Sequence, residues 1–545
     1  MDERFVSYDD FGAVGDGVTN DFFAMKAAHE YANEKGLPVR AGAQKTYLVS
    51  ETEVDGVASP IVVKTSTNFC GSTVVIDDTD IRWEPGNNKK SNTRIFSIES
   101  NYPVVEVEKK YIDKINASGG IKIGKTKKLE LGLGYPAMLI VYNDDERVYI
   151  RYGENEDSGS PKQELVLVDE NGNIDESTPW LFDYEKLTKI EAYRADEPEL
   201  VFENLYVLTK ASQVNLVDEY HSIGRGIQIM RSNTVVRNVE HKVINEIYRG
   251  ALKDGVPFVG HSYSFLTVAS ATNVLLEEVV FQARVYYLQG TYDFTASMAN
   301  NLILKNCRQN NFFAHYDYDH PELPAFANWW GVAGTNCCKN MVYDGCKLTR
   351  YDAHCGVVNG AIKNCEISSI RLIGGGDMLI ENCKIYQNDY TTLQLREDYG
   401  CTWRGTLTIR NSEFYDTFGE FNSFMMMRSS NHNYGYKTYF PNIVIDNVKI
   451  PEKIKELPLL FDFPMQATAS GCFYRSARDE NLAVPGAICA DGKPNVNPYT
   501  PPEFISVINN ENNGYEVTLP DVPFFRDTKI TGVKIVAADP CHLEI

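Results

Sequence analysis

A short repeat that ends on an asparagine is the feature of this 545-residue sequence that most restricts its fold. Its shortest spacing, 18 to 19 residues between Gly345, Asn364 and Asn382, is too short for a helix-pair repeat and fits one coil of a β-solenoid. We expect the wider spacings, 28 to 40 residues, to be the same coil with longer loops. The repeat occurs as VVRNV (235–239), LILKNC (302–307), VYDGC (342–346), AIKNC (361–365), LIENC (379–383), LTIRNS (407–412) and IVIDNV (443–448).

Apolar residues alternate before each asparagine, as Met378 and Ile380 do, and this is the period of a β-strand. The phase then slips, because the next inward pair is Cys383 and Ile385. Asn382 must therefore turn a corner, and asparagine or glycine suits a corner because both tolerate left-handed backbone angles. The repeat predicts an all-β solenoid whose corner asparagines stack and bond through their side-chain amides.

Four of the 12 cysteines, Cys307, Cys346, Cys365 and Cys383, have the same position in the repeat. A chain of this length needs no disulfide framework, so the regularity favours a buried stack of reduced thiols. The sequence has no CxxC pair with partner histidines, which argues against structural zinc. We expect no metal and no cofactor.

The N-terminal segment YDDFGAVGDGVTND (8–21), followed by FFAMKAAHEYANEKG (22–36) and VRAGAQKTYLV (39–49), resembles the opening of pectate-lyase-like right-handed parallel β-helix proteins. The resemblance covers this opening and the repeats from about 198 to 451. It implies that the coils are right-handed, that the signature begins the solenoid, and that a short helix covers its open end.

The residues of the opening support a helical cap without the resemblance. Phe22, Met25 and Ala28 share one helix face, and Gly36 ends the helix. A phosphate-binding glycine loop is the alternative, but GAVGDG has neither Walker nor dinucleotide spacing.

Residues 100–195 interrupt the repeat with alternating strands and DG or NG turns, which predict an inserted β module. After about residue 470 the pattern gives way to the Pro/Gly/Asn-rich segment AVPGAICADGKPNVNPYTPP (483–502). We expect four parts: an N-terminal cap with the first coils (1–99), the inserted β module (100–195), the parallel β-helix core with an active-site face (196–470), and a linker with a C-terminal β cap or assembly segment (471–545).

Charged residues keep step with the repeat. We number the residue after each corner asparagine or glycine as zero, so that Cys346 is zero on its coil. Positions five and seven are then mostly apolar, so positions six and eight should point to solvent. Position six is Asp352, Arg371 and Asp389 on three coils, and position eight is His315 and His354 on two. We expect each set to form a column across the coils.

Coils stack ~4.8 Å apart, so Asp352 and Asp389 should be about 9.6 Å apart. This is near the upper limit of about 6.5–9.5 Å for the carboxyls of an inverting glycosidase. On the coil that contains Asp389, the same numbering places Asn388 and Tyr390 at the inward positions five and seven. Alternating charges also stabilise a sheet surface, so a purely structural column remains open.

Polar and aromatic loop residues add candidate substrate contacts. Paired tryptophans suit stacking on the apolar faces of sugar rings, although they could instead form a hydrophobic plug beneath a loop. The candidates are His315, Asp317, Asp319, Trp329, Trp330, Arg396, Glu397 and Asp398.

The resemblance implies a carbohydrate-directed protein without fixing its reaction, since the superfamily includes lyases, hydrolases, epimerases, phage tailspikes and adhesins. We expect an inverting glycoside hydrolase of an oligo- or polysaccharide. Asp352 and Asp389 would be its acid and base, and His354 and Arg371 would hold them at different pKa values. A uronate lyase that uses Arg371 or a histidine as base is one alternative. A carbohydrate-binding phage-tailspike-like protein or adhesin is another.

The net charge of −21 and the scattered Lys and Arg residues argue against nucleic acid as a partner. No stretch of 18 apolar residues occurs, which argues against a membrane. The start, MDERFVSYDD, has no apolar signal region, so we expect a cytoplasmic protein, or a secreted one if a signal has been removed. Carbohydrate is the expected partner, and a homo-oligomer is compatible with the sequence.

Overall fold

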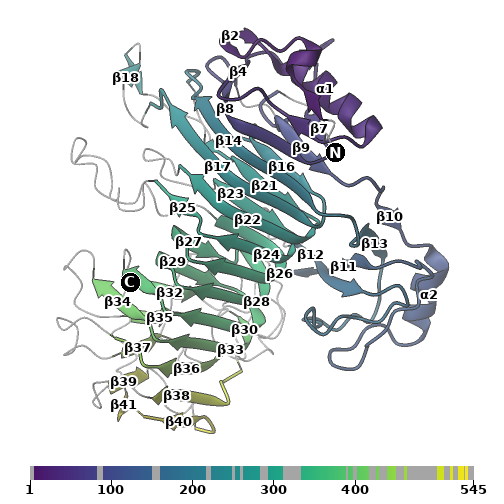
Figure 1. Cartoon of the computed structure of the whole chain (residues 1–545). Coiled ribbons are helices and arrows are strands. Elements are labelled where there is room, and N and C mark those ends of the chain that lie inside the picture. The colour runs from purple at the N-terminus through teal and green to yellow at the C-terminus, as the bar shows by residue number, and fades with distance from the viewer. Residues whose placement is uncertain are drawn as a thin grey trace. The chain divides into compact units, whose positions relative to one another are not determined.

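The structure is a computed structural model, and it forms two compact units. The first contains Met1–Val104, Tyr193–Gly334 and Gly345–Arg350, and the second contains Val105–Ala192, Thr335–Asp344 and Tyr351–Ile545. The residues it describes are 5–82, 90–149, 160–215, 222–247, 252–253, 255–257, 262–282, 293–310, 333–387, 391–396, 402–416, 425–428, 439–449, 459–462, 500–508, 516–519, 526–532 and 534–537. Within each unit most strands pair in parallel, coil upon coil (Figure 1), so the predicted parallel β-helix is confirmed.

The N-terminal signature places one buried carboxylate at the start of a helix. Helix α1 (Phe22–Lys35) is preceded by Asp21, whose side chain accepts hydrogen bonds from the backbone N–H groups of Val14 (2.7 Å) and Leu48 (3.3 Å). The helix buries Phe22, Met25 and Ala28 as predicted, and it ends at Gly36 with φ 65°. It packs beside β7 (Ile61–Val63), β1 (Val6–Ser7), β3 (Val39–Arg40) and β4 (Thr46–Val49), and β2 (Asp16–Asn20) precedes it in the chain.

The coils of the first unit contain two main rows of parallel strands. In one row Leu205 pairs with Val239, and Val239 pairs with Val279, so apolar residues of successive coils stack inside. This row contains β8 (Thr67–Asp77), β14 (Leu200–Lys210), β17 (Thr234–Ile244) and β22 (Thr272–Phe281). The other contains β7 (Ile61–Val63), β9 (Phe96–Glu99), β16 (Ile227–Met230), β21 (Leu266–Ala269) and β23 (Phe294–Ser297).

The coils of the second unit repeat this arrangement. One row contains β28 (Cys355–Lys363), β30 (Gly374–Glu381), β33 (Trp403–Arg410), β36 (Asn442–Asp446) and β38 (Phe504–Ile508). After the corner come β29 (Glu366–Leu372), β31 (Lys384–Gln387) and β34 (Glu413–Asp416). A further row contains β32 (Thr391–Leu395), β35 (Met425–Arg428), β37 (Leu459–Asp462), β39 (Glu516–Leu519) and β41 (Lys534–Ala537).

The asparagine corners are confirmed. Asn364, Asn382 and Asn411 have φ of 55°, 55° and 49°, the left-handed region that asparagine tolerates. The amide of Asn382 donates to the side chain of Asn364 (3.3 Å), and that of Asn447 donates to Asn411 (2.8 Å). Consecutive coils are therefore joined by side-chain bonds at the corner as well as by the strand ladder.

The cysteine stack is also confirmed. Cys307, Cys346, Cys365 and Cys383 are all free and buried. A hydrogen bond to Cys365, together with burial, raises the pKa of the Cys383 thiol, so it stays protonated at neutral pH.

The interruption of the repeat is a small antiparallel β module, which we call the inserted module (105–192). Its four-stranded sheet has the order β10 (Val105–Glu106), β13 (Lys189–Arg194), β11 (Ala137–Val148), β12 (Ser160–Val168). Leu139, Trp180 and Tyr184 belong to a hydrophobic core of its own, and helix α2 (Lys109–Ala117) packs Ile112 into it. The expected domain boundaries remain predictions.

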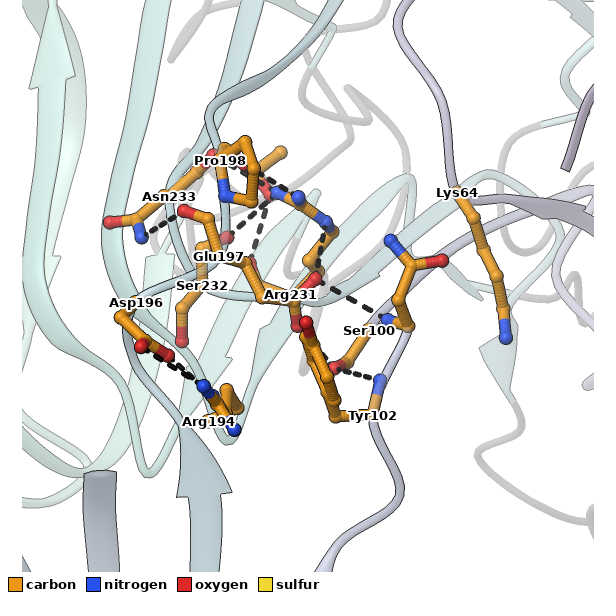
Figure 2. Close-up of polar contacts among 12 residues, drawn as sticks. Lys64, Ser100, Tyr102, Arg194, Asp196, Glu197, Pro198, Arg231, Ser232 and Asn233 are labelled. Atoms are coloured by element: carbon orange, nitrogen blue, oxygen red, sulfur yellow. Dashed lines mark hydrogen bonds and ion pairs between the residues drawn. The ribbon is translucent and has the colours of Figure 1, made fainter. Parts of the chain in front are cut away.

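A buried ion pair fixes the segments that lead into and out of the inserted module (Figure 2). Glu197 lies between Ser100, which donates to one of its oxygens, and Arg231, whose Nε is 3.1 Å from the other. Arg231 also donates to the carbonyl of Ser232 (3.0 Å). Inside the second unit, the buried ammonium of Lys339 on β26 (Ala333–Asp344) lies 2.8 Å from Glu164 of the inserted module. The module is therefore anchored at its ends and on one side.

Both α-helices in the described part of the chain are short. Neither is long and apolar enough to cross a membrane.

Candidate functional site

The predicted inward and outward positions are correct on two coils of the second unit. Tyr351, Ala353, Ile370 and Leu372 are fully buried, as expected for residues that point into the coil. Asp352 alternates with them, yet it is 0% exposed, so its predicted position at the solvent is wrong. An outward position on a strand is not the same as an exposed one when other side chains cover the strand.

The predicted column is right in its first two members and wrong in its third. The N–H of Ala353 donates to the carbonyl of Arg371 (2.9 Å), which puts Asp352 beside Arg371. Arg371 is paired with Gln394, not with Asp389, and donates a hydrogen bond to the Gln394 side chain. The predicted carboxylate pair about 9.6 Å apart is therefore not formed by this register.

The error comes from an insertion inside one coil. Glu366 pairs with Lys384, 18 residues later, whereas Ile370 pairs with Leu393, 23 residues later. The additional residues include Asp389, which lies outside the described residues, and the inward residues are Leu393 and Leu395 in place of Asn388 and Tyr390.

Asp352 and Arg396 form a buried ion pair. Nη1 of Arg396 lies 2.7 Å from Oδ1 and 3.0 Å from Oδ2 of Asp352. Arg396 directly follows strand β32 and is nearly buried, whereas we expected it in a loop as a substrate contact. The pair joins two coils, because the N–H of Arg396 donates to the carbonyl of Leu372 on the coil between them (2.8 Å). The catalytic role of Asp352 and the binding role of Arg396 remain predictions.

His354 is half-buried, with Nδ1 2.9 Å from the side-chain oxygen of Asn336 and 3.4 Å from the sulfur of Cys355. The second predicted column consists of His354 and His315. The other predicted site residues lie outside the described residues: His315, Asp317, Asp319, Trp329, Trp330, Asp389, Glu397 and Asp398.

Sequence reasoning missed an aromatic pair on the same coils. Tyr386 of β31 is in register with Tyr415 of β34, and the two half-buried rings stack with centroids 5.1 Å apart and planes 21° apart. The hydroxyl of Tyr386 donates to Glu366 (3.3 Å). The signal was in the sequence, since both tyrosines are three residues after the residue that follows the corner asparagine, in NCKIY and NSEFY.

Charged residues flank the stacked tyrosines. Glu366 pairs with Lys384, Lys384 pairs with Glu413, and Glu413 pairs with Lys449, so the sign alternates from coil to coil. Burial, and then Glu366, raises the pKa of Tyr386. Burial and Glu413 likewise raise the pKa of Tyr415 to about 12. Both phenols are therefore hydrogen-bond donors at neutral pH.

Comparison with solved structures gives the fold. The tailspike gp61 of Pseudomonas phage phi297 is 12% identical with a TM-score of 0.50, over 95% of this chain and 80% of that one. The tailspike gp49 of Pseudomonas phage LKA1 is 9% identical with a TM-score of 0.47, over 98% and 83%. The A-module of the Azotobacter vinelandii mannuronan C-5 epimerase AlgE4 is 11% identical with a TM-score of 0.38, over 85% and 99%. No family model matches the sequence, and no curated protein matches it.

This chain is a right-handed parallel β-helix protein. At 12% identity the likeness gives the fold and not the reaction. Among the described residues no group of three or more His, Cys, Asp or Glu side chains is placed to hold a metal ion.

Two polar columns of the β-helix cross the single strand β29. Glu366 and Ser368 lie beside Lys384 and Tyr386, and Arg371 lies beside Gln394. Glu366 and Ser368 flank the inward Ile367, whereas Arg371 lies between the inward Ile370 and Leu372, so the phase of the strand changes between the two columns. The arrangement offers aromatic faces, hydroxyl donors and carboxylate acceptors along one stretch of the coils.

Proposed function

We propose that this β-helix protein binds a carbohydrate along coils 351–449 and acts on it. The stacked, half-buried pair of Tyr386 and Tyr415 carries the proposal. The C–H face of a sugar ring packs on an aromatic face, and its hydroxyl edge needs acceptors and donors such as Glu366, Lys384 and Glu413. A tyrosine pair across strands also stabilises a sheet by itself, so the experiment must separate binding from stability.

Glycoside hydrolysis is the reaction we propose. Glu366 and Glu413 are two coils apart with Lys384 between them, which by strand spacing is about 9.6 Å. That spacing suits the two carboxyls of an inverting mechanism, in which one protonates the leaving oxygen and the other activates water. Both carboxylates are half-buried, whereas Asp352 is fully buried against Arg396, so this pair is the better candidate among the described residues.

The test begins with binding. The purified chain is screened against neutral and acidic polysaccharides by affinity electrophoresis, and the variants Tyr386→Ala and Tyr415→Ala are compared with Tyr206→Ala. Tyr206 is an exposed tyrosine on strand β14 of the first unit, so it is a matched control. Loss of a stacking face should weaken binding by about 1–2 kcal/mol, roughly 5- to 30-fold, while the control binds as the wild type does.

The reaction is tested on the polysaccharide that binds. New reducing ends without unsaturated product indicate hydrolysis, and Glu366→Gln or Glu413→Gln should then lower turnover by a factor on the order of 10² or more. Unsaturated uronate products would favour the lyase alternative, and binding without any product would favour a tailspike-like binding protein. If no polysaccharide binds, or if both tyrosine variants bind normally, the proposed surface is wrong.

A further inference from the structure

A hollow of about 390 Å³ opens on the surface of the inserted module, beside the end of helix α2. It is lined by Lys114, Lys122, Lys125 and Lys128 and by one carboxylate, Glu130. Residues 109–128 contain seven lysines and one aspartate, in a chain with a net charge of −21. The expectation that basic residues are scattered without a patch is therefore wrong for this module.

Backbone contacts give the hollow a fixed wall. After α2 the N–H of Gly120 returns to the carbonyl of Ile115 (3.0 Å), and Gly120 has φ 77°, which glycine adopts without strain. The N–H of Lys122 donates to the hydroxyl of Thr126 (2.9 Å), and the indole N–H of Trp180 donates to the carbonyl of Thr126 (3.0 Å). The lysine loop is thereby tied to the core of the module.

The lining has a net positive charge. Lys114 is paired with Glu130 (2.6 Å), and Lys128 also lies near enough to Glu130 to help lower its pKa, but Lys122 and Lys125 form no ion pair within the described part of the chain. A concave surface lined mostly by one sign of charge concentrates its field and attracts ions of the opposite sign. The hollow is therefore electropositive in a protein that is acidic as a whole.

We propose that this hollow binds an acidic saccharide unit, a sugar that carries a carboxylate or a sulfate. Its volume lies in the range of small-molecule sites. Ile115 offers apolar contact for a ring face, and the lysines offer point charges that accept an anionic group in several orientations. None of the lining residues is aromatic, so the hollow lacks the stacking surface that single-stranded nucleic acid uses. This second site is independent of the proposed function on the coils.

The experiment uses the full chain and titrates it by calorimetry with tetragalacturonate, with a heparin-derived tetrasaccharide and with neutral maltotetraose. We expect one or both acidic tetrasaccharides to bind, more weakly as salt rises, and the neutral one not to bind at this site. The variant Lys125→Gln/Lys128→Gln should lose at least 10-fold in affinity.

The matched control is Lys110→Gln/Lys127→Gln, which removes the same charge from exposed residues that do not line the hollow. It should change the affinity by less than 2-fold. The variant Tyr386→Ala/Tyr415→Ala should retain this binding, which separates the hollow from the tyrosine surface.

Three results would overturn the proposal: no acidic tetrasaccharide binds, the lining and control variants lose affinity equally, or a DNA oligonucleotide or phosphatidylserine vesicles bind as tightly through the same lysines. The last result would mean a basic surface without preference for sugars. All substituted lysines are on the surface, and circular dichroism checks that each variant remains folded.

Discussion

The substitution Asp352→Asn removes the negative partner of a buried ion pair in the second unit. Asp352 is 0% exposed, and it accepts both short contacts from Nη1 of Arg396. Without the carboxylate, the guanidinium stays buried and loses the negative charge of Asp352. Breaking such a pair costs about 3–5 kcal/mol, so we expect the melting temperature of this unit to fall by roughly 10 °C.

The double substitution Asp352→Leu/Arg396→Met removes both charges and fills similar space with apolar atoms. Because no buried charge is then left unpaired, we expect it to recover most of the stability that the single substitution loses. The wild type, Asp352→Leu, Arg396→Met and the double variant form a double-mutant cycle, and the coupling energy should exceed about 2 kcal/mol. The partly exposed pair of Glu381 and Arg410 (2.5 Å) is the matched control. Glu381→Gln should cost less than about 1 kcal/mol.

Thermal unfolding followed by far-ultraviolet circular dichroism measures all these variants, and turnover is compared only where each variant is folded. If Asp352→Asn melts with the wild type, the ion pair does not stabilise the coils and the reasoning fails. If it remains stable and loses turnover on an established substrate, the role of Asp352 is chemical and not structural.

Three further predictions test the fold. Burial holds the pKa of His29 at about 3 against 6.5 in the unfolded chain, so the unfolded state binds more protons between these values and stability falls as pH falls through them. The free energy of unfolding of the N-terminal cap should fall by about 1.4 kcal/mol per pH unit below 6.5. In His29→Leu this contribution is absent, so the melting temperature should fall less between pH 6.5 and pH 5 than it does in the wild type. Asn382→Ala should destabilise by about 2 kcal/mol in urea unfolding, and Asn382→Gly by less, because glycine keeps the left-handed backbone and loses only the amide bonds. The thiols of Cys365 and Cys383 should resist alkylation in the folded chain and react after unfolding, whereas a disulfide between them in mass analysis under nonreducing conditions would contradict the stack.

The fold could be predicted because its corners require a backbone conformation that asparagine and glycine supply. The repeat did not reveal the corner at Glu278, because a glutamate takes the left-handed conformation there, with φ 55°. A second asparagine ladder was also missed. Asn273 donates to Asn233 (2.9 Å), and Asn301 donates to Asn273 (2.8 Å), but these residues lie at or just before the starts of strands, whereas the repeat was aligned on corner residues after the apolar alternation.

The site could be predicted only near a corner. Each residue beyond the corner adds a chance that a loop has been inserted. Ile367 and Ile370 pair with Ile385 and Leu393, so the second coil has five more residues between the paired positions than the first. Apolar alternation could have exposed the error, because Leu393 and Leu395 are a better inward pair than Asn388 and Tyr390.

Positions close to the corner escape this error, because the corner asparagines Asn364, Asn382 and Asn411 and the buried residue after each of them align the coils there. Tyr386 and Tyr415 are such positions, and so are Glu366 and Glu413. Burial adds a second reason to prefer them, since Asp352 is fully buried against Arg396, whereas Glu366 and Glu413 are half-buried and Glu366 accepts a hydrogen bond from the Tyr386 phenol. Both reasons move the search for the acid and the base from the Asp352 column to the glutamates beside the stacked tyrosines.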